Sequence, residues 1–180
     1  MRKVTLFIAS SLDGFIARED GGIDWLFTDQ DYGYRDFYDS IDTVLMGSKT
    51  FKVAEQLGEQ FTGKECYVFS RSSEPRSGRE NVQYVSDPVG FTKSLVKQVG
   101  KLGIFLEGGG EIVSLFLNEG LIDEIILSVH PVLLGEGIPL FPNVGKQVNL
   151  KLLGARSYDS GLVQLHYQVV KASGSHNLSV

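Results

Sequence analysis

Three consecutive glycines, Gly108, Gly109 and Gly110, separate an apolar run of strand length from a segment with helical periodicity. Glycine adopts backbone angles closed to other residues and carries no Cβ, so a ligand can approach such a turn closely. The first amides of the following helix present free N–H groups and a positive dipole end to an anion. This turn therefore predicts a phosphate site, and a dinucleotide cofactor is the natural candidate.

Two further turns with anion-binding chemistry follow predicted strands. One supplies a glycine, a lysine and two hydroxyls, and the other a guanidinium between hydroxyls: Gly47-Ser48-Lys49-Thr50 and Ser70-Arg71-Ser72. Such groups bind a phosphate monoester through charge-assisted hydrogen bonds. Open α/β sheets bind ligands beyond the carboxyl ends of their strands. Either cation alone is more simply a solvated surface charge, but the three turns together favour an anion site.

The glycine-rich turn does not match the common nucleotide-binding motifs. It lacks the last glycine of G-x-G-x-x-G and an acid about 20 residues later, which disfavours a Rossmann domain. Ser48 replaces the glycine that precedes the lysine of a P-loop, which excludes a nucleoside triphosphatase of that type. A tight turn with close packing of helix on strand stays open as the structural alternative.

Hydride transfer to a C=N bond requires a proton donor, so acids near these turns are candidates. They are Asp13, Asp24, Asp29, Asp31 and Glu107. Helix capping is the simpler role for Asp29 and Asp31, and Asp13 stands in an ordinary turn beside a glycine. Glu107 ends a strand that should be buried, where a carboxylate needs a partner.

For Trp25, Cys66 and His130 the sequence predicts structural or less specific roles. Trp25 is expected in the core or in a pocket wall. Cys66 is expected to be a small buried residue of a strand. His130 has no acid or nucleophile near it in the sequence, so a structural role is predicted.

Length and composition limit the class of protein. The 180 residues predict one domain, residues 1–172, followed by a polar tail, residues 173–180. The net charge of -5 argues against non-specific nucleic-acid or membrane-surface partners. One cysteine excludes an internal disulfide, and the dispersed histidines give no zinc-type cluster, so no metal is predicted. No apolar run suits a signal peptide or a membrane span, and cytoplasmic residence is expected.

Strand and helix signals alternate along most of the chain. Strands are predicted at Lys3–Ser10, Phe15–Ala17, Thr43–Met46, Glu65–Ser70, Asn81–Val85 and Glu124–Val129 and before Gly108. Helices are predicted at 29–40, from 48 or 50 to 57, after Asp87-Pro88 with Phe91, Leu95 and Val99 inward, and from the glycine turn to 120. Leu150–Ser157 and Leu162–Val170 flank a turn as an antiparallel hairpin. The pattern predicts an α/β domain with a mixed, mostly parallel sheet flanked by helices.

In order and spacing the motifs resemble the dihydrofolate-reductase-like superfamily. Within it they are most similar to the reductase domain of riboflavin-biosynthesis deaminase-reductases and to small stand-alone bacterial proteins of that type. The resemblance covers nearly the whole chain and rests on Ser11–Gly14, Trp25, Val44–Thr50, Val68–Arg71, Glu107–Gly110, Leu121–Glu124 and Pro131–Gly137. It implies a three-layer fold, and NADPH bound by Gly47, Ser48, Lys49, Thr50, Ser70, Arg71, Gly108, Gly109 and Gly110, with Ser72 beside them.

The resemblance leaves the substrate side open. Asp31 or Gln30 stands where dihydrofolate reductases have their pterin-protonating acid, depending on whether the count starts at Met46-Gly47 or at Trp25. The segments around Asp13 and Glu107 look more like the riboflavin-pathway reductase, which reduces a ribosylaminopyrimidine phosphate. The zinc motif of the deaminase domain is not found in this sequence.

The expected activity is NADPH-dependent reduction of a small heterocycle by a homodimer, as relatives of the riboflavin type tend to be. Asp31, Asp13 or Glu107 would orient the substrate or relay a proton, and Trp25 and Gln30 would contact the substrate. A true dihydrofolate reductase and a nucleotide-binding sensor without chemistry are the alternatives.

Overall fold

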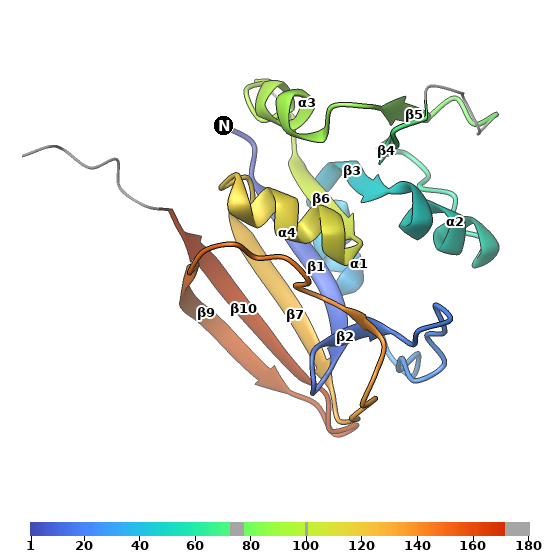
Figure 1. The fold of residues 1–180 in the computed structure, drawn as a ribbon, viewed down its shortest axis with the longest axis vertical. Helices are drawn as coiled ribbons and strands as arrows, with labels where there is room; N and C mark the ends of the chain where they lie inside the picture. Colours follow the sequence, from blue (N-terminus) through green and yellow to red (C-terminus); the bar gives the residue numbers. More distant parts are fainter. Residues whose placement is uncertain (73–77, 100, 172–180) are drawn as a thin grey trace, which may run out of the picture.

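An eight-stranded sheet forms the centre of the computed structural model, which describes residues 1–72, 78–99 and 101–171 (Figure 1). In spatial order its strands are β5 (Val82–Val85), β4 (Glu65–Phe69), β3 (Ile41–Gly47), β6 (Gly103–Gly108), β1 (Val4–Ser11), β7 (Glu124–His130), β10 (Val163–Val170) and β9 (Asn149–Ser157). The strands from β5 to β7 are parallel, and β10 and β9 are antiparallel to their neighbours. The predicted mixed sheet with a C-terminal antiparallel hairpin is confirmed.

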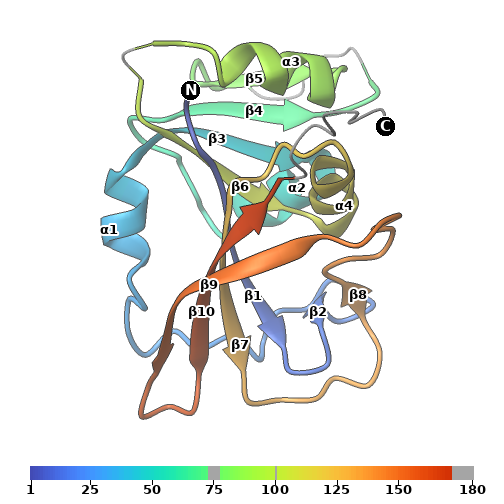
Figure 2. The same ribbon diagram turned by 90° about the vertical axis from the view of Figure 1, so that its left-hand side faces the viewer.

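Helices cover both faces of the parallel part of the sheet (Figure 1, Figure 2). They are α1 (Tyr34–Asp39), α2 (Ser48–Gln56), α3 (Pro88–Leu95) and α4 (Gly110–Asn118). Alternate side chains of a strand point to opposite faces. Leu106 therefore packs with Phe116 on the face of α3 and α4, whereas Phe105 belongs to the cluster of Phe51 on the face of α1 and α2. The three-layer α/β architecture expected from the sequence is confirmed.

A second, two-stranded sheet pairs β2 (Phe15–Ala17) with β8 (Ile138–Pro139). The sequence predicts β2 but not β8, because a two-residue strand that contains a proline has no periodicity to detect. The predicted C-terminal tail, residues 173–180, lies outside the described residues.

The predicted helix over residues 29–40 is too long at its start, since α1 begins at Tyr34. Tyr32 and Gly33 have φ values of 52° and 78°, which an α-helix cannot contain. The Tyr32 hydroxyl donates a hydrogen bond of 2.6 Å to Asp29 and lies 2.8 Å from Ser160 Oγ. These tertiary contacts hold the left-handed conformation and override the helical spacing of the aromatic residues.

The start of α3 follows the prediction but its end does not. The Asp87 side chain accepts a hydrogen bond of 2.9 Å from the Gly90 N–H, and Pro88 is in the first turn. The helix ends at Leu95, which is buried, whereas Val99 is 97 % exposed. The prediction that Val99 faces inward is therefore wrong, because the helix stops one turn before this residue.

Candidate functional site

The structure brings the three predicted anion-binding turns to one edge of the sheet. They follow β3, β4 and β6, which are parallel neighbours, so their carboxyl ends meet there. A Cβ added to Gly47 would lie 3.9 Å from the Gly108 carbonyl oxygen and 3.9 Å from the Gly109 nitrogen. The turns after β3 and β6 are thus in direct contact.

The three glycines have different surroundings. Gly108 has a φ of 121°, a conformation that favours glycine, and the peptide bond between Gly108 and Gly109 is cis. An added Cβ on Gly109 would lie 3.2 Å from Thr50 Oγ1, and one on Gly110 would lie 2.4 Å from the Pro139 carbonyl oxygen. Close packing against β8 therefore accounts for glycine at position 110, as the structural alternative expected. Gly108 and Gly109 shape the turn beside the β3 end.

The cations of the other two turns, Lys49 and Arg71, are exposed. Lys49 lies in the first turn of α2, and Arg71 follows β4. Neither side chain forms a hydrogen bond or an ion pair within the described parts of the chain. The backbone beside Arg71 is fixed, because the Ser70 N–H donates to the Val85 carbonyl at 3.0 Å and the Ser72 N–H donates to Ser70 Oγ at 3.2 Å. Among the described residues, the turn therefore presents an exposed, unpaired guanidinium beside hydrogen-bonded backbone.

Glu107 is the candidate acid that lies next to the glycine turn. It is the penultimate residue of β6, on the sheet face covered by α1 and α2. The residue is half-buried, but its Oε2 atom is out of contact with solvent and has no hydrogen-bond partner among the described residues. Burial, with a smaller contribution from the negative charge of Glu59, raises the pKa of Glu107 to about 8. At pH 7 this carboxyl group is mainly protonated and can donate a proton.

Phenol groups lie near Glu107 on the same face. Burial, followed by the charges of Glu107 and Glu59, raises the pKa of Tyr34 above its usual range. Burial, followed by the charges of Glu59 and Glu107, raises the pKa of Tyr38 to about 12. Both phenols are neutral at pH 7 and give Glu107 an aromatic, weakly polar environment.

Asp13 occupies a different environment from Glu107. Its carboxylate accepts hydrogen bonds from Ser11 Oγ at 2.6 Å and from the N–H groups of Leu134 and Gly135 at 3.1 and 2.8 Å. The bond from Ser11 is the main cause that lowers the pKa of Asp13, with the two amides adding to it. Asp13 is therefore ionised, and its hydrogen bonds join the β1–β2 turn to the loop after β7. This geometry favours a structural role over proton transfer.

Asp31 and Gln30 lie on the surface at the approach to α1. The backbone N–H of Arg35, in the first turn of α1, donates to the Asp31 carboxylate, whose two oxygens both lie 3.2 Å away, although the N-cap residue of this helix is Gly33. The Gln30 amide donates a hydrogen bond of 3.4 Å to Asp29. Within the described residues, no hydrogen bond or ion pair joins Asp31 or Gln30 to Glu107, and the bond from Arg35 gives Asp31 a role at the start of the helix.

The sequence does not predict that His130 lies at this edge of the sheet and contacts Trp25. His130 ends β7 at the same edge of the sheet, is 3 % exposed, and contacts the ring of Trp25, which is 8 % exposed. Its position as the last residue of a parallel strand is a signal for it in the sequence, because ligands bind beyond the carboxyl ends of such strands.

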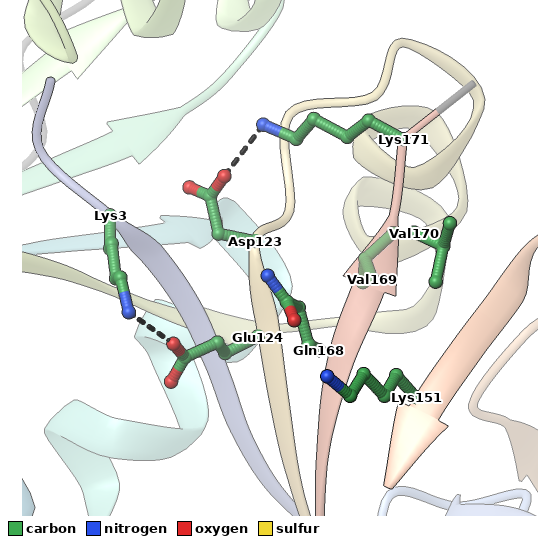
Figure 3. A pocket seen from close by; sticks show the side chains of 8 residues that line it. All are labelled: Lys3, Asp123, Glu124, Lys151, Gln168, Val169, Val170 and Lys171. Atoms are coloured by element: carbon green, nitrogen blue, oxygen red, sulfur yellow. Dashed lines mark hydrogen bonds and ion pairs between the residues drawn. The ribbon is translucent and has the colours of Figure 1, made fainter. Parts of the chain in front are cut away.

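A surface cavity of about 450 Å³ lies at the opposite ends of β1 and β7 (Figure 3). Ion pairs of 2.5 Å between Lys3 and Glu124 and of 2.6 Å between Lys171 and Asp123 lie among the residues that line it. Its carboxylates are therefore already paired with lysines, and none of the predicted site residues lines it.

Within the described ranges, no group of three or more His, Cys, Asp or Glu side chains could hold a metal ion. No helix in the same ranges is long and apolar enough to cross a membrane.

Comparisons with known proteins give consistent matches. Residues 61–164 match the family described as the RibD C-terminal domain. The chain is 41 % identical over 171 residues to the uncharacterized protein YwjB of Bacillus subtilis (strain 168), with 92 % of this chain and 97 % of that protein covered. It is similar to the crystal structure of a putative riboflavin biosynthesis protein from Shewanella sp. PV-4, with 28 % identity, a TM-score of 0.83, and 94 % and 99 % coverage.

A more distant solved structure shares the fold. It is a diaminohydroxyphosphoribosylaminopyrimidine deaminase/5-amino-6-(5-phosphoribosylamino)uracil reductase from Thermotoga maritima, with 18 % identity and a TM-score of 0.71. The match covers 94 % of this chain and 57 % of that one.

Proposed function

The chain belongs to the RibD C-terminal domain family, and we propose that it is an NADPH-dependent reductase of a small heterocyclic substrate. The family and its dihydrofolate-reductase-like fold, both expected from the sequence, are confirmed. The nearest reference compound is 5-amino-6-(5-phosphoribosylamino)uracil, which the Thermotoga maritima protein reduces according to its name.

The residues at the sheet edge fit a dinucleotide cofactor. Gly108 and Gly109 leave the backbone uncovered beside Thr50, and α4 begins directly after them with free N–H groups. Lys49 and Arg71 provide exposed positive charges at the two neighbouring turns. When bound, NADPH would supply the hydride, and these residues would hold its phosphates.

The observation that carries the proposal is the carboxyl group of Glu107 beside this turn, whose Oε2 atom is buried without a hydrogen-bond partner among the described residues. When hydride adds to the carbon of a C=N bond, the nitrogen gains a proton. A carboxyl group with a pKa of about 8 holds that proton at neutral pH and can release it to a bound base. Its Oε2 atom has no competing hydrogen-bond partner in the described chain. Glu107 is therefore assigned as the catalytic acid.

Calorimetric titration with NADPH and, separately, with NADH tests the cofactor before any substrate is chosen. We expect NADPH to bind more tightly, and binding of neither nucleotide would exclude the proposal. The loss of NADPH absorbance then tests 5-amino-6-(5-phosphoribosylamino)uracil, other ribosylaminopyrimidines and dihydrofolate. Turnover of dihydrofolate alone would indicate a dihydrofolate reductase, and tight NADPH binding without turnover of any heterocycle would favour the sensor alternative.

A homodimer and cytoplasmic residence stay predictions. Sedimentation of the purified protein tests the first, and fractionation of cells that express the chain tests the second.

A further inference from the structure

His130 holds a segment that is far from it in the sequence. Its Nε2 atom accepts a hydrogen bond of 3.2 Å from the Phe27 N–H, across a sequence separation of 103 residues. Its Nδ1 atom lies 3.3 Å from the Ser128 carbonyl oxygen. A carbonyl oxygen only accepts, so the ring proton belongs on Nδ1 and Nε2 is a bare acceptor. Both ring nitrogens of neutral His130 are thereby used.

Aromatic contacts fix the same segment from the side. The imidazole centroid lies 5.1 Å from the Trp25 ring at an interplanar angle of 88°, and 4.9 Å from the Phe27 ring at 57°. The edge-to-face contact with Trp25 favours one relative orientation of these two rings. The Trp25–Phe27 segment is therefore attached to the end of β7 by one hydrogen bond and two ring contacts.

Trp25 itself has an unused donor. Its Nε1 atom is buried and has no hydrogen-bond partner in the part of the chain that the structure describes. A buried N–H group without a partner is unfavourable and is rare in folded proteins. A ligand that offers an acceptor atom to this N–H group would remove the penalty.

We propose that neutral His130 is a positioning residue that holds the Trp25–Phe27 segment so that the Trp25 indole N–H can donate to an acceptor atom of the substrate. The assignment of the ligand as substrate rests on the proposed function. The substrate class that it specifies is a heterocycle with a carbonyl oxygen or an unprotonated ring nitrogen. Protonation of His130 ends this arrangement.

The effect of protonation follows from the hydrogen-bond geometry. In the imidazolium both nitrogens are donors, so Nε2–H would face the Phe27 N–H and the bond between them would be lost. Burial lowers the pKa of His130, while the Ser128 and Ser10 carbonyls and the charge of Asp29 act in the opposite direction. Asp29 is the one ionised side chain whose charge reaches His130 in the described chain. The neutral form therefore prevails at pH 7, and the segment is released on the acid side.

Trp25 provides a direct probe because it is the one tryptophan of the 180-residue sequence. We would titrate its fluorescence against pH in the wild-type protein, in His130→Gln and in His130→Leu. Glutamine keeps an acceptor at a reach similar to that of Nε2 but does not titrate, and leucine removes the acceptor. Far-UV circular dichroism at each pH separates a local change from global acid unfolding.

The expected result is a fluorescence transition in the wild type below the ordinary pKa of histidine, with unchanged circular dichroism. His130→Gln should lack the transition and keep the neutral-pH spectrum, whereas His130→Leu should show the acid-type spectrum at every pH. Asp29→Asn should move the wild-type midpoint to lower pH, because it removes the charge that favours imidazolium. A flat wild-type titration, or the same transition in His130→Gln, would overturn the proposal.

Steady-state kinetics add a readout for the active protein. His130→Leu should raise the KM for the heterocycle about tenfold, the value for one hydrogen bond of about 1.4 kcal/mol, with a smaller change in the KM for NADPH. His130→Gln should restore the wild-type KM. Equal changes in both KM values would contradict a role directed at the substrate. The fluorescence result does not depend on turnover, so failure of the reductase assignment and failure of this inference can be told apart.

Discussion

Thr50 Oγ1 lies 3.2 Å from the position that a Cβ would take on Gly109, so the turns after β3 and β6 touch through these two residues. Gly108 and Gly109 thus shape the proposed cofactor site, whereas Gly110 packs against β8. Substitution by alanine should distinguish them.

Gly110→Ala should lower the free energy of unfolding by about 1–3 kcal/mol, the usual cost of overpacking. The new Cβ would meet the Pro139 carbonyl oxygen at 2.4 Å, and backbone atoms cannot rotate away. Gly109→Ala should lower the free energy of unfolding less than Gly110→Ala. It should weaken NADPH binding, because Thr50 must shift. Urea denaturation measures the first effect and calorimetry the second. Gly154→Ala, where an added Cβ meets nothing within 4 Å, is the matched control.

Arg71→Ala should weaken NADPH binding by about 1–3 kcal/mol and leave NADH binding unchanged, as expected for a charge-assisted bond to the extra phosphate. Calorimetric titration with both nucleotides measures the difference. Arg35→Ala, an exposed arginine of α1, serves as the control. Equal weakening of NADPH and NADH would show that Arg71 does not recognise the phosphate.

Glu107→Gln should remove a pH dependence of stability. The pKa of Glu107 is raised from 4.5 to about 8 in the folded protein, so the folded state binds more protons than the unfolded state between these values. Wild-type stability should therefore fall as pH rises from about 4.5 to 8, by about 2–4 kcal/mol. Urea midpoints across this range measure the slope. Glu136→Gln, an exposed acid, should retain the slope, and an unchanged slope in Glu107→Gln would disprove the assignment.

The same Glu107→Gln variant should lose turnover while it still binds NADPH. Glutamine has a similar shape but cannot release a proton to the substrate, and removal of a general acid typically slows a reaction about 100- to 10,000-fold. Stopped-flow absorbance measures the rate of NADPH oxidation. Retained wild-type kcat would assign the proton to another donor.

Asp13→Asn should destabilise the protein without changing the pH profile of turnover. The carboxylate stabilises the fold at neutral pH, and because the pKa of Asp13 is lowered, this contribution should be lost as pH falls through the folded pKa. In the variant, one of the acceptors that faces Leu134 and Gly135 becomes an NH2 donor. Thermal melting and limited proteolysis of the 132–135 loop test the effect. Asp159→Asn, another exposed acid, is the control. A shift in the pH dependence of kcat in Asp13→Asn would show that Asp13 takes part in proton transfer.

The sequence predicts the edge of the sheet where the site lies, because each anion-binding turn directly follows a parallel strand. Local signals were sufficient there, as they were for the Asp87 cap of α3. The start of α1 could not be predicted, since the conformation of Tyr32 depends on Ser160, which is 128 residues away. The helical spacing of the aromatic residues cannot predict a contact with so distant a residue.

The same limit applies to the proton donor. The sequence placed Glu107 in a buried strand and required a partner for its carboxylate, but burial instead favours its protonated form. It left Asp13 and Asp31 as rivals because their hydrogen-bond partners, the amides of 134–135 and of Arg35, are defined only by the folded backbone. His130 was assigned a structural role because its partner, Phe27, lies in a loop without periodicity.

The Tyr32 hydroxyl contact with Ser160 and the Phe27 bond to His130 have a consequence for the order of events during folding. They close loops of 128 and 103 residues, and contacts between such distant positions are slow to form because of chain entropy. During synthesis, the segment that contains Phe27 and Tyr32 can form both contacts only after β7 and the C-terminal hairpin have emerged from the ribosome. The pairing of β1 with β6 and β7, in which Val4 lies beside Ile104 and Thr5 beside Glu124, closes loops of similar length. We therefore expect the Phe27 amide to gain protection from hydrogen exchange together with the amides of β1, in one late cooperative step.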